Sequence, residues 1–142
     1  MVPEASNDAR SPIRKLRDCL ASVDFLRQLN LDELDKLMGA LKRRVSPAGT
    51  TVIKLGDPGD AFYMISTGKV EVWDRSKLLA TRLPGEYFGE SALVSDAPRA
   101  ATVKCLTETE LYVLYKEDFK KILMANPSIA ASIKVHMAKL KY

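Results

Sequence analysis

Histidine and cysteine are scarce in this chain of 142 residues, which contains one histidine and two cysteines. Metal sites built on several histidines are therefore excluded, as is a histidine-activated nucleophile away from His136. His136 falls on a predicted terminal helix, where a structural role is favoured. Cys19 and Cys105 lie far apart and match no metal-binding spacing, which is typical of a reduced, intracellular protein of the cytoplasm. These scarcities predict a protein that is not an enzyme and has no metal site.

Long apolar runs are also missing. No run approaches the ~20 residues of a membrane span, and residues 1–10 lack the apolar stretch of a signal peptide. The formal net charge of +4 permits an anionic ligand but does not indicate nucleic acid as a partner. Hydrophobic residues make up 46% and charged residues 28%, which is typical of one globular domain.

The residues that are present predict helices, then one β unit, then helices again. Residues 1–10 form a small, polar tail, and residues 11–44 have helical periodicity, with Lys42, Arg43 and Arg44 ending the second helix. Residues 116–142 return to helical spacing and are expected to form a hinge and lid helices. Residues 45–115 predict short strands between glycine-rich turns, at 51–55, 61–66, 69–74, 78–83, 100–105 and 110–115. This order favours a mainly β fold with flanking helices, an antiparallel jelly roll or barrel.

Residues 85–103 break the strand rhythm and contain the candidate site, here called the cassette. After Gly89, which allows a close approach, residues 90–94 begin like a short helix whose first amides point outward, as an anion site requires. Arg99, after the turn at Pro98, adds a bidentate contact to a phosphate. Glu90 has the wrong sign for a phosphate but suits sugar hydroxyls. The cassette therefore predicts a site for a phosphate and a ribose.

The runs 88–93 and 98–103, Phe-Gly-Glu-Ser-Ala-Leu and Pro-Arg-Ala-Ala-Thr-Val, resemble the phosphate-binding cassette of cyclic nucleotide-binding domains. The nearest likeness is to the regulatory subunits of cAMP-dependent protein kinase. Residues 56–63 and 67–70 resemble strand and turn signatures of the same family. The likeness covers roughly residues 26–140. It implies a regulatory sensor domain with no cofactor, whose ligand is a cyclic nucleotide.

The resemblance also implies roles for individual residues. Arg99 would bind the cyclic phosphate, and Glu90 would bind the ribose 2′-hydroxyl beside Gly89. Asp60 would support Arg99 from behind, although a plain turn aspartate is the alternative. The remaining phosphate contacts would come from Ser91 and from the backbone amides of Ala92 and Ala100. Leu93 and Val103 would make apolar contacts to the base or ribose.

The choice of base depends on the position after the phosphate-binding arginine. Family members that prefer cGMP commonly have Thr or Ser there, whereas this chain has Ala100, which favours cAMP. A cGMP-binding domain and a structural domain that binds no ligand remain the alternatives. In this family a residue of the last helix or of a neighbouring domain usually caps the base, and the candidates here are Met137, Leu140 and Tyr142. For Met137 and Leu140, packing on the β unit is the favoured alternative.

The resemblance further implies an effector that responds when the ligand moves the helices around the β unit. A protein kinase catalytic subunit is the best match to the resemblance, and a channel or an exchange factor is an alternative. The hinge is expected at residues 115–119, where the strands give way to helix.

Overall fold

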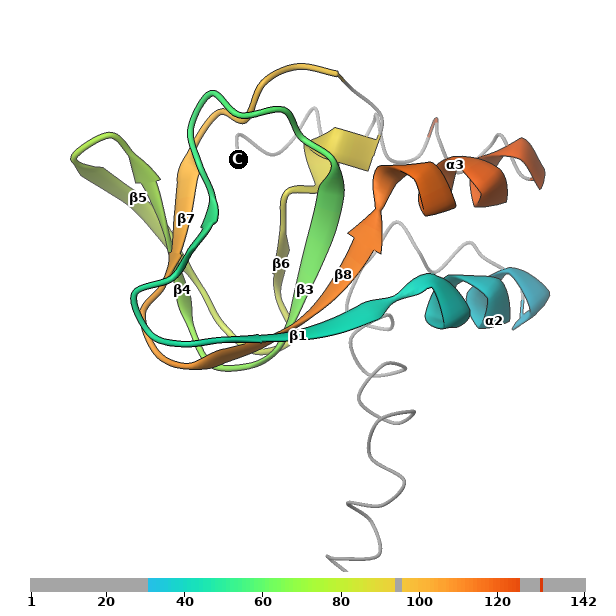
Figure 1. Ribbon diagram of the computed structural model, residues 1–142, viewed down its shortest axis with the longest axis horizontal. Coiled ribbons are helices and arrows are strands. Elements are labelled where there is room, and N and C mark those ends of the chain that lie inside the picture. Colours follow the sequence, from blue (N-terminus) through green and yellow to red (C-terminus); the bar gives the residue numbers. More distant parts are fainter. Residues whose placement is uncertain (1–30, 94–95, 126–130, 132–142) are drawn as a thin grey trace, which may run out of the picture.

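Two four-stranded antiparallel sheets face each other (Figure 1). The computed structural model describes residues 31–93, 96–125 and 131. One sheet has the order β1 (Lys42–Ser46), β8 (Thr109–Tyr115), β3 (Ala61–Thr67) and β6 (Tyr87–Phe88). The other has the order β2 (Thr51–Ile53), β7 (Thr102–Cys105), β4 (Val70–Asp74) and β5 (Lys77–Arg82). The predicted mainly β, antiparallel jelly-roll architecture is confirmed.

Apolar side chains from both sheets meet in the space between them. Because side chains alternate along a strand, every second residue of β3, β8, β4 and β7 points into this space. The cluster includes Tyr63, Ile65, Leu111 and Val113 from one sheet and Val70, Val72 and Val103 from the other, all buried. This barrel cluster holds the two sheets together.

The other face of β3 and β8 is covered by helices α2 (Leu31–Ala40) and α3 (Lys116–Ala125) (Figure 1). Phe119 of α3 and Leu37 of α2 are fully buried there, against Phe62 of β3 and Leu114 of β8. A single turn of 3-10 helix, η2 (Glu90–Leu93), contacts both β3 and α3. The predicted short helix of the cassette is therefore present, and it lies where the barrel meets the helices.

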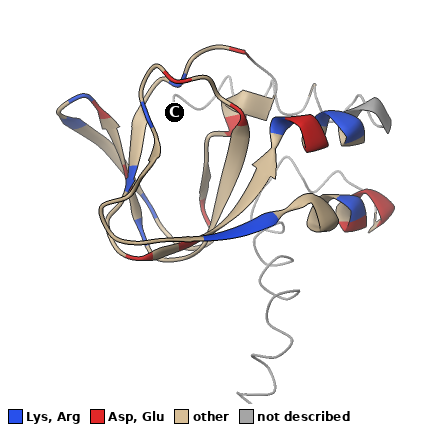
Figure 2. Ribbon diagram, viewed as in Figure 1, with Lys and Arg blue, Asp and Glu red and all other residues tan. Residues whose placement is uncertain are grey.

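The basic run Lys42–Arg44 forms strand β1, so the prediction that it ends the second helix is wrong (Figure 2). Helix α2 ends at Ala40, and β1 pairs with β8 from Lys42 opposite Val113 onward. The guanidinium Nε of Arg43 lies 2.5 Å from the carboxylate of Glu110 on β8. The β unit thus begins at Lys42 rather than Val45, because a partner 67 residues away in sequence decides the conformation.

All six predicted strands are present, with shifted ends. β6 was missed because two residues carry no periodic signal. Cys105 is buried with a free thiol, whereas Cys19 lies outside the described residues. The predicted first and last helices, with His136 and the lid candidates Met137, Leu140 and Tyr142, also lie outside them. Among the described residues, no helix has the length and apolar character needed to cross a membrane.

Candidate ligand-binding site

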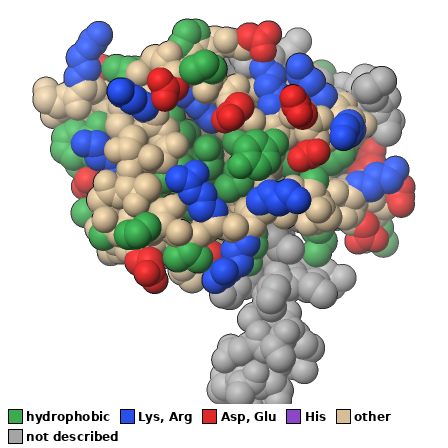
Figure 3. Space-filling model, in the orientation of Figure 1, with side chains coloured by type: hydrophobic (Ala, Val, Ile, Leu, Met, Phe, Trp, Pro, Cys, Tyr) green, Lys and Arg blue, Asp and Glu red, His purple; other side chains and the backbone are tan. Residues whose placement is uncertain are grey.

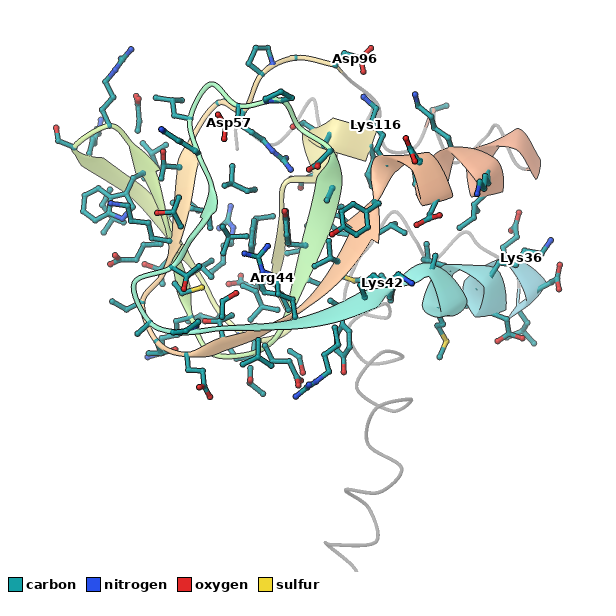
Figure 4. The ribbon with its side chains drawn as sticks, viewed as in Figure 1. Lys36, Lys42, Arg44, Asp57, Asp96 and Lys116 are labelled. Carbon is teal, nitrogen blue, oxygen red and sulfur yellow. The ribbon has the colours of Figure 1, made fainter. Side chains whose placement is uncertain are left out.

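The loop that carries Arg99 is fixed to the turn between β2 and β3. The backbone N–H of Arg99 donates to the carbonyl of Asp57 at 2.8 Å, and the N–H of Gly56 donates to the carbonyl of Arg99 at 2.9 Å. Pro58 and Pro98 form an isolated β-bridge beside these bonds. Asp57 lies on this turn at the upper end of the barrel in Figure 4. Two segments that are far apart in sequence therefore hold the backbone of Arg99 in place.

The guanidinium of Arg99 is directed inward, and the residue is only 7% exposed. Its Nη2 donates to the carbonyl of Ala61 at 2.6 Å and its Nη1 to the carbonyl of Gly89 at 3.1 Å. Burial lowers the pKa of Arg99, and the nearby Tyr63, Asp60 and Glu90 oppose that shift. An arginine has five N–H donors and stays charged in proteins. A buried cation with donors beyond these two bonds is suited to binding an anion.

Two glycines allow the arginine to pack this closely. Gly89 has a φ of +80°, and a Cβ placed there would lie 3.0 Å from Nη1 of Arg99. A Cβ on Gly59 would lie 3.0 Å from the Cβ of Ala92 and 3.3 Å from Nε of Arg99. Gly89 was among the predicted site residues, whereas Gly59 was not singled out as one. The only sequence signal for Gly59 is its place in a Gly-Asp-Pro-Gly turn, which does not reveal what it packs against.

Gly59→Ala is expected to lower the free energy of unfolding by about 1–3 kcal/mol, because a methyl group is forced between Arg99 and Ala92. Gly39→Ala is the matched control: a Cβ there meets no atom within 4 Å, and alanine favours helix α2 by up to about 1 kcal/mol. Urea denaturation of both variants measures the difference. Equal stability changes in the two variants would contradict the close packing at Gly59.

Glu90 begins η2 and is buried, with 4% of its surface exposed. Burial raises the pKa of this carboxyl from 4.5 to about 6. Its own backbone N–H and the positive charges of Arg82 and Arg99 oppose the rise. A carboxyl held in a buried position with a raised pKa is typical of functional sites, since folding alone does not favour it. Glu90 and Arg99 thus belong to one buried, electrostatically linked pair.

The other predicted site residues are distributed around this pair. Ser91 and Ala100 are exposed, and the buried Ala92 donates its N–H to the carbonyl of Gly89 at 3.2 Å. Asp60 acts on Arg99 through its charge, while the guanidinium donates hydrogen bonds to the carbonyls of Ala61 and Gly89. The supporting role of Asp60 stays a prediction.

The structure does not bring Leu93 and Val103 together. Leu93 is 1% exposed and packs in the helix-side cluster, whereas Val103 is 4% exposed and packs in the barrel cluster. Both side chains serve the core, which leaves little of their surface for a ligand. Their predicted contacts with a base or ribose stay untested.

A pocket of about 340 Å³ opens beside Arg99, between β2 and the start of β3. The pocket is lined by both charged and apolar side chains. Both kinds are also interspersed over the face of the molecule in Figure 3. The lining residues are Val52, Ile53, Lys54, Asp57, Pro58, Asp60, Tyr63 and Arg99. Arg99 is the predicted site residue that connects this pocket with the cassette.

A β barrel that holds a buried arginine and a buried carboxylate beside a tight 3-10 turn is built to bind a small anionic ligand. Comparison with known proteins agrees with this class. The family model of the cyclic nucleotide-binding domain matches residues 43–126. The chain therefore belongs to the cyclic nucleotide-binding domain family, which confirms the resemblance in the sequence.

Two curated relatives illustrate the range of the family. The cAMP-dependent protein kinase regulatory subunit of Yarrowia lipolytica is 42% identical over 106 residues, which is 73% of this chain and 28% of the relative. A cyclic nucleotide-gated potassium channel of Mesorhizobium japonicum is 34% identical over 111 residues, which is 78% of this chain and 31% of the relative. The chain spans less than a third of either relative. The family is regulatory, so the prediction that the domain is not an enzyme is confirmed.

Solved structures agree with these relatives. The regulatory domain of Toxoplasma gondii PKA with cAMP is 28% identical, with a TM-score of 0.72 over 77% of this chain and 43% of that one. The catabolite activator protein of Thermus thermophilus is 29% identical, with a TM-score of 0.71 over 82% of this chain and 57% of that one. The fold is therefore that of a cyclic nucleotide-binding domain.

Proposed function

We propose that this domain binds cAMP in preference to cGMP and transmits binding to the helices beside the barrel. The observation that carries the proposal is the buried pair of Arg99 and Glu90, which supplies a cation for the cyclic phosphate and an acceptor for the ribose 2′-hydroxyl. Ser91, Ala92 and Ala100 of the cassette would supply further phosphate contacts, for which the Ala92 N–H would give up its bond to the Gly89 carbonyl. The ligand is the only small molecule that the proposal requires; no cofactor takes part.

Helix α3 is the element proposed to respond to binding. At its first residue, the backbone N–H of Lys116 donates to the carbonyl of Asp60 at 2.9 Å. The ammonium group of Lys116 forms an ion pair with Asp96, in the cassette loop after η2 (Figure 4). Phe119, one turn further along α3, is fully buried in the same apolar cluster as Leu37 of α2. A shift of the cassette is therefore passed to α3 and from there to α2.

The proposed effector is a protein kinase catalytic subunit, because the relative with 42% identity is a kinase regulatory subunit. A channel is the second candidate, because the Mesorhizobium relative is a potassium channel. Both remain proposals, since this chain corresponds to a minor part of either relative's length.

Calorimetry with cAMP and cGMP side by side tests the binding proposal. We expect cAMP to bind more tightly, and a cAMP concentration 100 times Kd to stabilise the domain by about 2.7 kcal/mol through mass action. Thermal unfolding with each nucleotide checks the same point independently. No heat of binding and no rise in Tm at saturating cAMP would overturn the proposal, and equal affinities would remove the base preference.

Ala100→Thr is expected to narrow the preference for cAMP over cGMP by about 1–3 kcal/mol, because the added hydroxyl supplies a partner for the guanine. Ala100 is exposed, so the larger side chain does not disturb the core. The ratio of the two dissociation constants measures the effect. An unchanged ratio would place base selection at another position.

A further inference from the structure

The ring of Tyr63, on β3, packs against the start of the cassette. Tyr63 is directly opposite Phe88 of β6, and the two rings are stacked, with centroids 5.1 Å apart and an interplanar angle of 9°. Both side chains are buried in the barrel cluster, and Tyr63 is 6% exposed. Gly89 and Glu90 follow Phe88 directly in the chain. The stack therefore fixes the Tyr63 ring next to the residues that form the site.

The guanidinium of Arg99 lies beside this stack. Its Nη1 donates to the carbonyl of Gly89, the residue after Phe88. Its Nη2 donates to the carbonyl of Ala61, two positions before Tyr63 on β3, so the side chains of Ala61 and Tyr63 lie on the same face of the sheet. Tyr63 and Arg99 also line the same pocket of about 340 Å³. The hydrogen bonds of Arg99 thus hold its guanidinium close to the Tyr63 side chain.

The hydroxyl of Tyr63 is the polar end of this buried ring. Within the residues that the structure describes, every fully buried side-chain oxygen and nitrogen has a hydrogen-bond partner. No described residue forms a hydrogen bond with the Tyr63 hydroxyl, so this oxygen belongs to the small exposed part of the side chain, which lines the pocket. Burial raises the pKa of Tyr63, and Arg99 is the largest charge that opposes the rise, so the hydroxyl keeps its proton at neutral pH. It is therefore a hydrogen-bond donor that a ligand in the pocket can use.

We propose that the Tyr63 hydroxyl is a further ligand-binding group: it donates a hydrogen bond to an exocyclic oxygen of the cyclic phosphate that Arg99 binds. The inference rests on the proposed function, since it refines how the phosphate is bound. It adds a neutral donor from β3 to the contacts that the cassette supplies. It predicts that part of the affinity for the phosphate depends on a residue outside the cassette.

Tyr63→Phe removes the hydroxyl and keeps a ring that stacks on Phe88. Calorimetry should show cAMP binding weakened about tenfold or more, because a hydrogen bond to a charged group is lost. Urea denaturation without nucleotide should show no loss of stability, because the hydroxyl has no partner among the described residues. Tyr112→Phe is the matched control: it removes a hydroxyl from the helix-side cluster and should leave the affinity unchanged.

Two results with Tyr63→Phe would overturn the inference. One is an unchanged affinity for cAMP. The other is a loss of stability without nucleotide, which would assign the hydroxyl to a partner within the protein, such as the carboxylate of Asp60 in the same pocket.

The two phosphorothioate analogues of cAMP locate the contact. In each analogue sulfur, a weak acceptor, replaces one of the two exocyclic oxygens. The loss caused by Tyr63→Phe should be smaller for the analogue whose sulfur replaces the oxygen that the hydroxyl contacts. Equal losses for cAMP and both analogues would overturn the inference while leaving the proposed function intact. If the unaltered chain binds none of the three nucleotides, the proposed function fails and the inference fails with it.

Discussion

Replacing Arg99 by alanine is expected to weaken cAMP binding by about 2–5 kcal/mol, because a buried cation that contacts the cyclic phosphate is removed. The guanidinium is buried and held by the carbonyls of Ala61 and Gly89, so its position is set before the ligand arrives. Calorimetry at a temperature where the variant is folded measures the loss. Circular dichroism establishes that the fold persists.

Two further variants separate the shape of Arg99 from its charge. Arg99→Lys keeps the charge but cannot reach both carbonyls and a phosphate with one ammonium group, so an intermediate loss is expected. Lys104→Ala removes a positive charge from an exposed position on β7 and should leave binding unchanged. If Arg99→Ala binds cAMP as tightly as the unaltered chain, Arg99 does not belong to the site.

Glu90→Gln is expected to stabilise the domain at neutral pH while weakening its binding of cAMP. The pKa of Glu90 rises from 4.5 to about 6 on folding, so ionisation of this carboxyl opposes the folded state. The stability that it contributes is complete below pH 4.5 and is lost as the pH rises through about 6. The difference corresponds to about 2 kcal/mol. Glutamine carries no charge and avoids that loss.

Urea denaturation without nucleotide should therefore show Glu90→Gln to be more stable than the unaltered chain at pH 8, by up to about 2 kcal/mol. The advantage should vanish near pH 4.5. Glu108→Gln, at an exposed position, is the control and should show no such pH dependence. A variant that is less stable at pH 8 would contradict the sign derived from the burial of Glu90.

Binding should change in the opposite direction. Glu90→Gln is expected to weaken cAMP binding by about 1.5–3 kcal/mol, the range for a hydrogen bond to a charged group. Binding of 2′-deoxy-cAMP should be unaffected, because that ligand lacks the hydroxyl. A gain in stability together with a loss of affinity would identify Glu90 as a residue kept for function at the expense of the fold.

Much of the fold and the cassette was predictable because the relevant signals are local. The strands were predicted as short runs rich in apolar residues, and turns such as Pro84-Gly85 separate them. Phe88 to Leu93 and Pro98 to Val103 are continuous runs, so they could be recognised without knowing what surrounds them. Gly89, Glu90 and Arg99 were found in this way.

Features that depend on distant partners were not predictable. From the sequence alone, the basic run Lys42–Arg44 is typical of the end of a helix. In the fold this run is a strand, because β8 pairs with it and Glu110 neutralises Arg43. The sequence indicates only that Gly59 belongs to a turn. Its close packing against Arg99 is visible only in the tertiary structure. Lys116 and Asp96 form an ion pair although they are 20 residues apart in sequence. Neither helical nor strand periodicity predicts a contact between them.

The sequence alone determined the order of helices and strands, the location of the cassette and the chemical types that it offers to a ligand. Only the tertiary structure decided which of those groups are buried and which charges face them. Burial raises the pKa of Glu90, and the charge of Arg82, at the end of β5, opposes that rise. Such effects depend on distances in space and on exclusion of water, and neither is encoded by spacing along the chain.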